Sequence, residues 1–119
     1  MKANANAKIE KEIYNKLALY NFSSSLLGYN YIAEAIMVCL IKNCHIKNIE
    51  EEIYSIIASK YNVSIDSVER NIRNAIKQAK DECFVLNYSQ LFKDNYDLKY
   101  GGNKRFILNI ANQIKSSNI

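Results

Sequence analysis

The sequence predicts an all-α fold, a six-helix bundle in which the third and fourth helices form a helix-turn-helix. Proline is absent and glycine occurs only three times, and these two residues destabilise helix interiors most. Apolar residues recur every three or four positions along most of the chain, which is the period of a helix with one buried face. No alternating stretch is long enough to require a strand.

The chain length bounds the domain organisation. A length of 119 residues fits one compact domain with a single core. Residues 1–8 show no apolar period and are expected to be a disordered leader or linker remnant, with the domain at 9–119. The longest apolar run, 31–41, is far shorter than the roughly 20 residues of a membrane span, and no signal peptide is recognisable. We therefore expect a cytoplasmic protein without membrane contact.

The first two helices are predicted from their apolar stripes. The first begins at residue 9, and its stripe is formed by Ile9, Ile13, Leu17 and Tyr20. The second, about 26–42, is the most apolar in the chain and should be the central core helix. Ser24 or Ser25 is expected to cap it, because serine hydroxyls accept hydrogen bonds from free helical amides.

The third and fourth helices flank a tight turn at residues 61–63. Asn48 and Glu51 make an approximate capping box for the third helix. Asn62 suits the left-handed conformation of the turn, and Ser64 opens the fourth helix, about 65–80. The third helix should bury Ile53, Ile56, Ile57 and Tyr61, and the fourth should bury Ile65, Val68, Ile72, Ala75, Ile76 and Ala79.

The remaining chain predicts two more helices. Residues 84–86 resemble a buried apolar anchor, and a short helix is expected near 88–93. A loop at 95–102 follows. Asn103 is expected to cap a last helix that buries Phe106, Ile107, Ile110 and Ile114.

The polar face of the fourth helix suggests double-stranded DNA as the partner. Arg70 and Arg73 lie about one turn apart, and each guanidinium can donate two hydrogen bonds to guanine. Glu69 could accept from cytosine or orient Arg70 through an ion pair, so these three are the predicted base contacts. The predicted contacts to the DNA backbone are Lys60, Ser64, Ser67, Asn74, Lys77 and Lys80. The net charge of +4 suits a polyanion but is also common elsewhere.

Other functions are weaker on this sequence. Cys39, Cys44 and His45 lack a well-spaced fourth zinc ligand, and Cys83 is distant, so we expect reduced thiols and no metal. No nucleophile with an orienting acid or phosphate-cradling loop is evident, so we expect neither a cofactor nor an enzyme. The alternative is a helical protein-interaction module, an adaptor or antagonist of a transcription regulator or RNA polymerase without specific DNA binding.

Three segments carry a resemblance to a known family. These are GYNYIAEAI at 28–36, VERNIRNAI at 68–76 and NKRFILNIANQI at 103–114. They resemble the DNA-binding effector domain of stage-zero sporulation protein A, the sporulation master response regulator of endospore-forming Firmicutes. The resemblance covers about residues 9–115.

The resemblance implies a six-helix fold that binds operator boxes, often as adjacent copies, with Glu69, Arg70 and Arg73 as base contacts. It also implies that residues 81–95 face the sigma subunit of RNA polymerase, and that the isolated domain is a monomer off DNA. Ser67 and Asn74 replace basic or imidazole side chains of Bacillus members, and Gly101-Gly102 replaces proline. Members carry a receiver domain that this sequence lacks, so we expect an isolated effector domain or a short paralogue.

Overall fold

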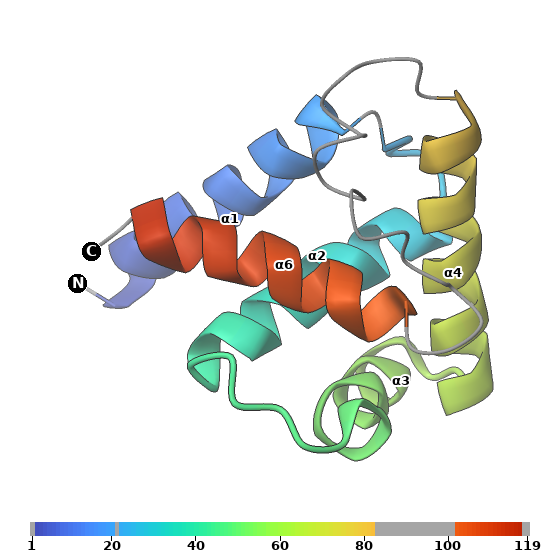
Figure 1. Ribbon diagram of the computed structural model, residues 1–119. Coiled ribbons are helices and arrows are strands. Elements are labelled where there is room, and N and C mark those ends of the chain that lie inside the picture. Colours follow the sequence, from blue (N-terminus) through green and yellow to red (C-terminus); the bar gives the residue numbers. More distant parts are fainter. Residues whose placement is uncertain (1, 21, 83–101, 118–119) are drawn as a thin grey trace.

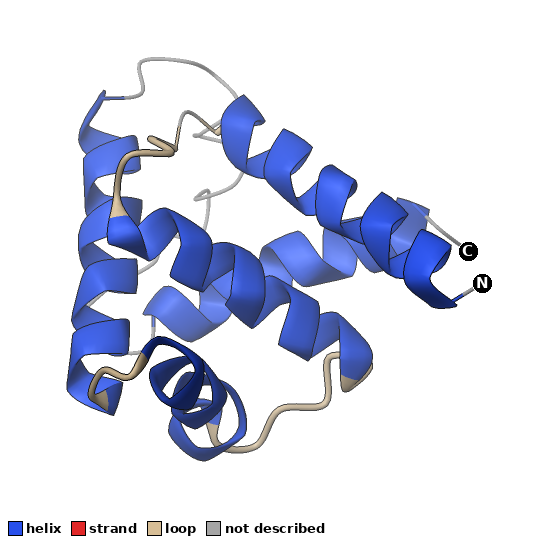
Figure 2. Cartoon of the chain, turned by 180° about the vertical axis from the view of Figure 1, so that it is seen from behind, coloured by secondary structure: helices blue, strands red, loops and turns tan. Residues whose placement is uncertain are grey.

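The described part of the protein is helical throughout, without a strand (Figures 1 and 2). A computed structural model describes residues 2–20, 22–82 and 102–117. Its elements are α1 (Lys2–Leu19), α2 (Leu27–Ile41), the π-helical turn η1 (Glu50–Tyr54), α3 (Ser55–Tyr61), α4 (Ile65–Glu82) and α6 (Gly102–Ser117). The all-α prediction is confirmed. The anchor expected at 84–86 and the helix expected at 88–93 lie outside the described residues, so the count of six is not confirmed.

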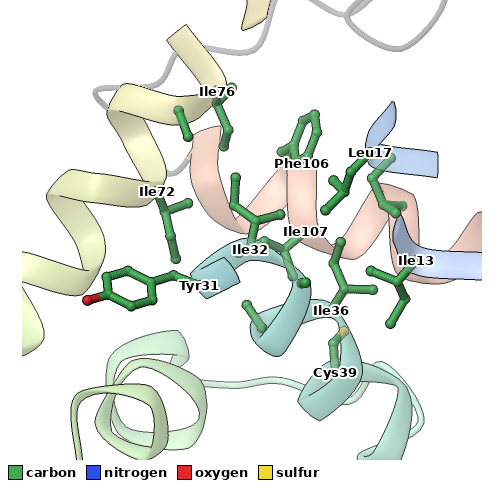
Figure 3. Close-up of a cluster of buried hydrophobic side chains, with 14 of the residues drawn as sticks. Ile13, Leu17, Tyr31, Ile32, Ile36, Cys39, Ile72, Ile76, Phe106 and Ile107 are labelled. Carbon is green, nitrogen blue, oxygen red and sulfur yellow. The ribbon is translucent and has the colours of Figure 1, made fainter. Parts of the chain in front are cut away.

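Helix α2 is the central element, as predicted. It packs most extensively against α4 and α6, and it also contacts α1, α3 and η1. Figure 3 shows Ile32 and Ile36 of α2 among side chains from α1, α4 and α6. The fully buried isoleucines of α2 are therefore the residues against which α1, α4 and α6 pack.

The two ends of α2 depart from the predicted core. Leu27 is 63% exposed and Ile41 is 72% exposed, although the apolar pattern places both in the helix interior. Both lie on the side of α2 that also carries Asn30 and Glu34, away from the buried face. An apolar run that covers most of a helix circumference does not indicate which side its neighbours leave open.

Helices α2 and α4 cross with their backbones in contact at Gly28. A Cβ added at Gly28 would lie 2.1 Å from the carbonyl oxygen of Asn71 and 2.8 Å from the Cβ of Ala75. Real Cβ atoms do not approach other atoms so closely, so the crossing requires glycine here. The small side chain of Ala75 completes the contact from α4.

Two predicted helix starts differ from the structure. α1 begins at Lys2 rather than at Ile9, so residues expected to form a disordered leader are helical backbone. Alanines 3, 5 and 7 favour helix, and neither proline nor glycine interrupts them. At α2 the serines do not cap the helix, because the hydroxyls of Ser23 and Ser25 bond each other at 2.7 Å and Leu26 occupies the cap position. The division into a leader and one domain stays a prediction.

The start of η1 is capped by Asn48 in a reciprocal arrangement. The Asn48 Oδ1 accepts from the amides of Glu50 at 3.0 Å and Glu51 at 3.2 Å. The carboxylate that bonds back is that of Glu52 rather than the predicted Glu51, and it accepts from the amides of Asn48 at 2.6 Å and Lys47 at 2.7 Å. These two bonds lower the pKa of Glu52. The difference follows from the π-turn, which holds one residue more than an α-turn.

None of the described helices is both long enough and apolar enough to cross a membrane.

Candidate nucleic-acid interface

The turn between α3 and α4 is a Schellman motif centred on Asn62. Asn62 has φ 55° and ψ 50°, the left-handed conformation that the sequence predicts for it. Its amide donates to the Ser59 carbonyl at 3.4 Å, and the Val63 amide donates to the Ala58 carbonyl at 3.0 Å. Both bonds satisfy carbonyls that the end of α3 leaves open. α3 and α4 are therefore joined by a short connection of defined geometry.

Ser64 begins α4 as predicted. Its Oγ accepts a hydrogen bond from the Ser67 amide at 3.0 Å, and its carbonyl accepts one from the Val68 amide at 3.1 Å. A serine in this position satisfies one of the free amides of the first turn. Asp66 adds a negative charge in that turn, where the helix dipole favours it.

Helix α4 divides into a buried stripe and an exposed face. The buried residues are Val68, Ile72, Ala75, Ile76 and Ala79, as predicted. The sixth predicted member, Ile65, is 37% exposed because it stands at the helix start, beyond the main contact with α2. The other side of α4 carries what we call the α4 outer face, formed by Glu69, Arg70, Arg73, Asn74 and Lys77.

Arg70 is an exposed cation of the α4 outer face. Its side chain is exposed, and it forms no hydrogen bond or ion pair with any other described residue. Asn74 and Lys77 are also exposed, about one and two turns further along the helix. An unpaired guanidinium keeps all its donors available for an external acceptor.

Glu69 is paired with Arg73. The Arg73 Nη1 donates to both carboxylate oxygens of Glu69, at 2.9 Å to Oε1 and 3.2 Å to Oε2. The two side chains are 34% and 40% exposed, so the pair is only partly solvated. The predicted alternative, in which Glu69 orients Arg70, is wrong. Consecutive helical residues point about 100° apart, whereas residues four apart share a face.

The predicted backbone contacts do not form one group. The Ser67 Oγ and carbonyl accept from the Asn71 Nδ2 at 3.3 and 2.8 Å, so this serine is engaged within its own helix. Lys60 is paired with Glu34 of α2, and this bond raises the pKa of the lysine. It lines a pocket of about 290 Å³ together with residues of α1 and α2. The side chain of Lys80 lies outside the described residues.

Lys60 belongs to a small aromatic cluster next to α2. Its Nζ lies 5.6 Å from the centre of the Tyr61 ring, and the Tyr61 hydroxyl donates to the Glu34 carboxylate at 3.3 Å. The Tyr61 ring in turn lies 5.1 Å from that of Tyr31. Tyr61 is nevertheless 38% exposed and Ile56 is 46% exposed, so the predicted burial of these two residues is wrong. Lys60 is therefore held by α2 and not by the α4 outer face.

Asn103 of α6 contacts the backbone of α4, a role that the sequence does not predict for it. α6 begins at Gly102, so Asn103 lies inside the helix rather than capping it. Its side chain is 5% exposed, and its Nδ2 donates to the carbonyl of Glu69 at 3.2 Å. The sequence did contain a signal. Asn103 precedes Phe106 and Ile107 by three and four residues and so continues their buried stripe.

The described cysteines and acids do not form a metal site. Among the described residues there is no group of three or more His, Cys, Asp or Glu that could hold an ion. Cys39 and Cys44 are free thiols. Burial, and then the neighbouring Cys44, raise the pKa of Cys39 to about 12, so this thiol stays protonated at neutral pH.

A comparison with known families gives the context of this surface. The family model described as "Sporulation initiation factor Spo0A C terminal" matches residues 11–114. The chain belongs to this family. The match spans α2, η1, α3 and α4 entirely, so every predicted contact residue lies within the Spo0A C-terminal region. The Spo0A C-terminal domain is the effector domain of a sporulation regulator, a class that binds DNA in general. No solved structure matched the chain.

Proposed function

We propose that this protein binds double-stranded DNA in a sequence-specific manner, as the effector domain of a sporulation-type transcription regulator. In this proposal α3 and α4 act as a helix-turn-helix, and α4 lies in the major groove. The observation that carries the proposal is the α4 outer face, which is free of apolar side chains and presents Arg70 without any partner in the described structure.

The rigidity of α4 supports this role. A recognition helix must hold its side chains in a fixed position relative to the bases. The left-handed turn at Asn62 fixes the start of α4, and the backbone contact at Gly28 fixes its middle against α2. The major groove is about 12 Å wide and admits one helix with its side chains.

The base contacts differ in their state before binding. Arg70 can approach guanine O6 and N7 without breaking any interaction with a described residue. Arg73 is already paired with Glu69 before DNA binds, so the two side chains present hydrogen-bond donors and an acceptor side by side. We assign Arg70, Arg73 and Glu69 to the base edges on this basis.

The backbone contacts follow from position on the helix. Ser64, Ser67 and the first amides of α4 lie at its amino end, where phosphates bind favourably. Asn74, Lys77 and Lys80 follow along the helix and are assigned to phosphates. A contact from Lys60 would require it to leave Glu34, and because the lysine is 57% exposed this exchange costs little.

The remaining partners rest on family membership. We propose operator boxes as tandem copies, an approach of the sigma subunit of RNA polymerase to residues 81–95, and a monomer in the absence of DNA. We propose that this regulator acts in the cytoplasm of an endospore-forming bacterium, and we propose no cofactor, metal or enzymatic activity for it.

Fluorescence anisotropy tests the proposal directly. The protein is titrated onto a labelled duplex with a sporulation-type box and onto a scrambled duplex of the same length and composition. We expect tighter binding to the box, with log affinity falling linearly as log salt rises because phosphates are neutralised. Equal affinity for both duplexes at low salt would contradict the proposal and favour a protein-interaction module.

A further inference from the structure

The buried amide of Asn103 connects three elements of the fold. It lies in the first turn of α6 and donates to the main-chain carbonyl of Glu69 on α4 at 3.2 Å. It also interacts with Tyr54 of η1, a tyrosine that is only 2% exposed, and lowers the pKa of that tyrosine. A single side chain therefore joins α6 and η1 to one residue of α4.

The residue that Asn103 holds is the one that orients Arg73. The Glu69 carboxylate accepts both hydrogen bonds from the Arg73 Nη1. Its main chain accepts the bond from Asn103. A shift of the Glu69 backbone would move its carboxylate, and the guanidinium bonded to that carboxylate would move as well.

Stability alone does not explain an amide at this position. The Asn103 Oδ1 is buried and has no hydrogen-bond partner within the described structure. A buried acceptor without a partner destabilises a protein, and an apolar side chain of similar size avoids that cost. Buried polar groups of this kind are known to fix one arrangement of packed elements at some expense of stability.

We propose that Asn103 is a positioning residue for DNA sequence recognition, acting through Glu69 on Arg73. This inference rests on the DNA binding proposed above. In this role Asn103 touches no base. It sets where the Glu69–Arg73 pair lies relative to the bases.

The test compares Asn103→Leu with the intact protein in the anisotropy assay. Leucine matches asparagine in size but cannot donate to Glu69. We expect the ratio of specific to non-specific affinity to fall roughly five- to tenfold. Affinity for the scrambled duplex and the salt dependence of binding should stay unchanged. The unfolding temperature should stay unchanged or rise.

A double-mutant cycle separates positioning from a general structural effect. In an Arg73→Ala background, Asn103→Leu should lose most of its effect on the specificity ratio, whereas in a background of Lys77→Ala, about two turns further along α4, it should keep its full effect. Asn103→Ala serves as a second variant, because it removes the amide without adding an apolar branch. Asn112→Leu on the exposed side of α6 is the matched control and should change nothing.

The outcomes are distinct. If the intact protein prefers the box and both Asn103 variants keep the same ratio, the inference is overturned while the proposed function stands. Equal losses on box and scrambled duplex, or additive losses with Arg73→Ala, also overturn it. If the intact protein itself shows no preference, the proposed function fails and the inference fails with it.

Discussion

Individual side chains of the α4 outer face should contribute to DNA binding in two different ways. Arg70 has no partner among the described residues and is predicted to contact a base, whereas Lys77 is exposed and predicted to contact a phosphate. Arg70→Ala should cost about 1–3 kcal/mol on the cognate box and relax base choice at one position. Lys77→Ala should weaken all duplexes alike and reduce the slope of log affinity against log salt by about 1.

Anisotropy titrations with single-base variants of the box would measure both effects, and circular dichroism would confirm that each variant is folded. The assignment of Arg70 is contradicted if its replacement weakens cognate and scrambled duplexes equally. The assignment of Lys77 is contradicted if its loss changes the base preference.

The backbone at Asn62 makes a second prediction at this scale. Asn62→Gly should keep the stability of the protein, because glycine adopts the left-handed conformation without strain. Asn62→Ala should lower the free energy of unfolding by about 1 kcal/mol, because a Cβ without a local polar partner disfavours this conformation. Urea unfolding of the three proteins measures the difference. An alanine variant as stable as the glycine variant would contradict the assigned role of the turn.

Residue-level prediction from the sequence succeeded where it depended on local geometry. The face that carries Arg70 and Arg73 follows from helical period alone, and the left-handed Asn62 follows from its intrinsic preference. The hydrogen bond from Asn103 to Glu69 joins residues 34 positions apart, and no local pattern encodes which distant carbonyl a side chain reaches. The serines at 23–25 do not cap α2, because Leu26 occupies the cap position and the hydroxyls of Ser23 and Ser25 bond each other.

Among the elements, the crossing of α2 and α4 should be sensitive to substitution at Gly28. Gly28→Ala gains about 1 kcal/mol of helix propensity. It also places a Cβ 2.1 Å from the backbone oxygen of Asn71, which cannot rotate away as a side chain could. Overpacking of this kind costs typically 1–3 kcal/mol or more, so a net loss of stability is expected.

Thermal and urea unfolding test this prediction, with Asn30→Ala on the exposed side of α2 as the control. The control gains propensity without a clash and should be at least as stable as the intact protein. A Gly28→Ala variant as stable as the control would show that α2 and α4 can move apart without loss of stability, which would contradict the prediction.

The elements themselves were predicted more reliably than their ends. Apolar period located α2, α4 and α6, because each buries one continuous stripe. The ends depend on where neighbouring elements stop, which is why Leu27 and Ile41 are exposed despite belonging to an apolar run. In the π-turn η1 the capping carboxylate belongs to Glu52 instead of Glu51, and the apolar period does not distinguish such a turn from ordinary helix.

For the whole molecule, stability should fall at alkaline pH as Tyr54 ionises. Burial raises the pKa of Tyr54 from 10.0 to about 12, and the hydrogen bond from Asn103 opposes that shift. The unfolded chain releases this proton first, so the stabilisation is complete below pH 10 and is lost as the pH rises through about 12. The loss amounts to roughly 2–3 kcal/mol, from about 1.4 kcal/mol for each unit of pKa.

Urea unfolding between pH 8 and pH 11, compared with Tyr54→Phe, isolates this contribution. Burial also raises the pKa values of Tyr14, Tyr29 and Tyr61, so both proteins should lose stability. The intact protein should lose more than the variant. If the free energies of unfolding of the two proteins fell in parallel as the pH rose, folding would not raise the pKa of Tyr54 and the prediction would be contradicted.

For the whole molecule, the sequence predicted the all-α fold class and the central helix α2, but not how the other helices are arranged around α2. Scarce glycine and absent proline indicated an all-helical chain, and the apolar excess of residues 26–42 indicated the core helix. Periodicity gives each helix a buried face without saying which other helix covers it. The predicted DNA contacts show the same limit. Lys60 lies shortly before α4 in the sequence, but it is paired with Glu34 of α2.

The backbone contact at Gly28 also restricts how this family can diversify. A side chain at this position and a larger one at Ala75 would compete for the same space, so the two positions should vary together rather than independently. Lineages that keep this crossing should retain glycine at the first position and a small residue at the second. Where the first position is no longer glycine, the two helices must have moved apart, and the α4 outer face would then lie differently against the DNA proposed as its partner.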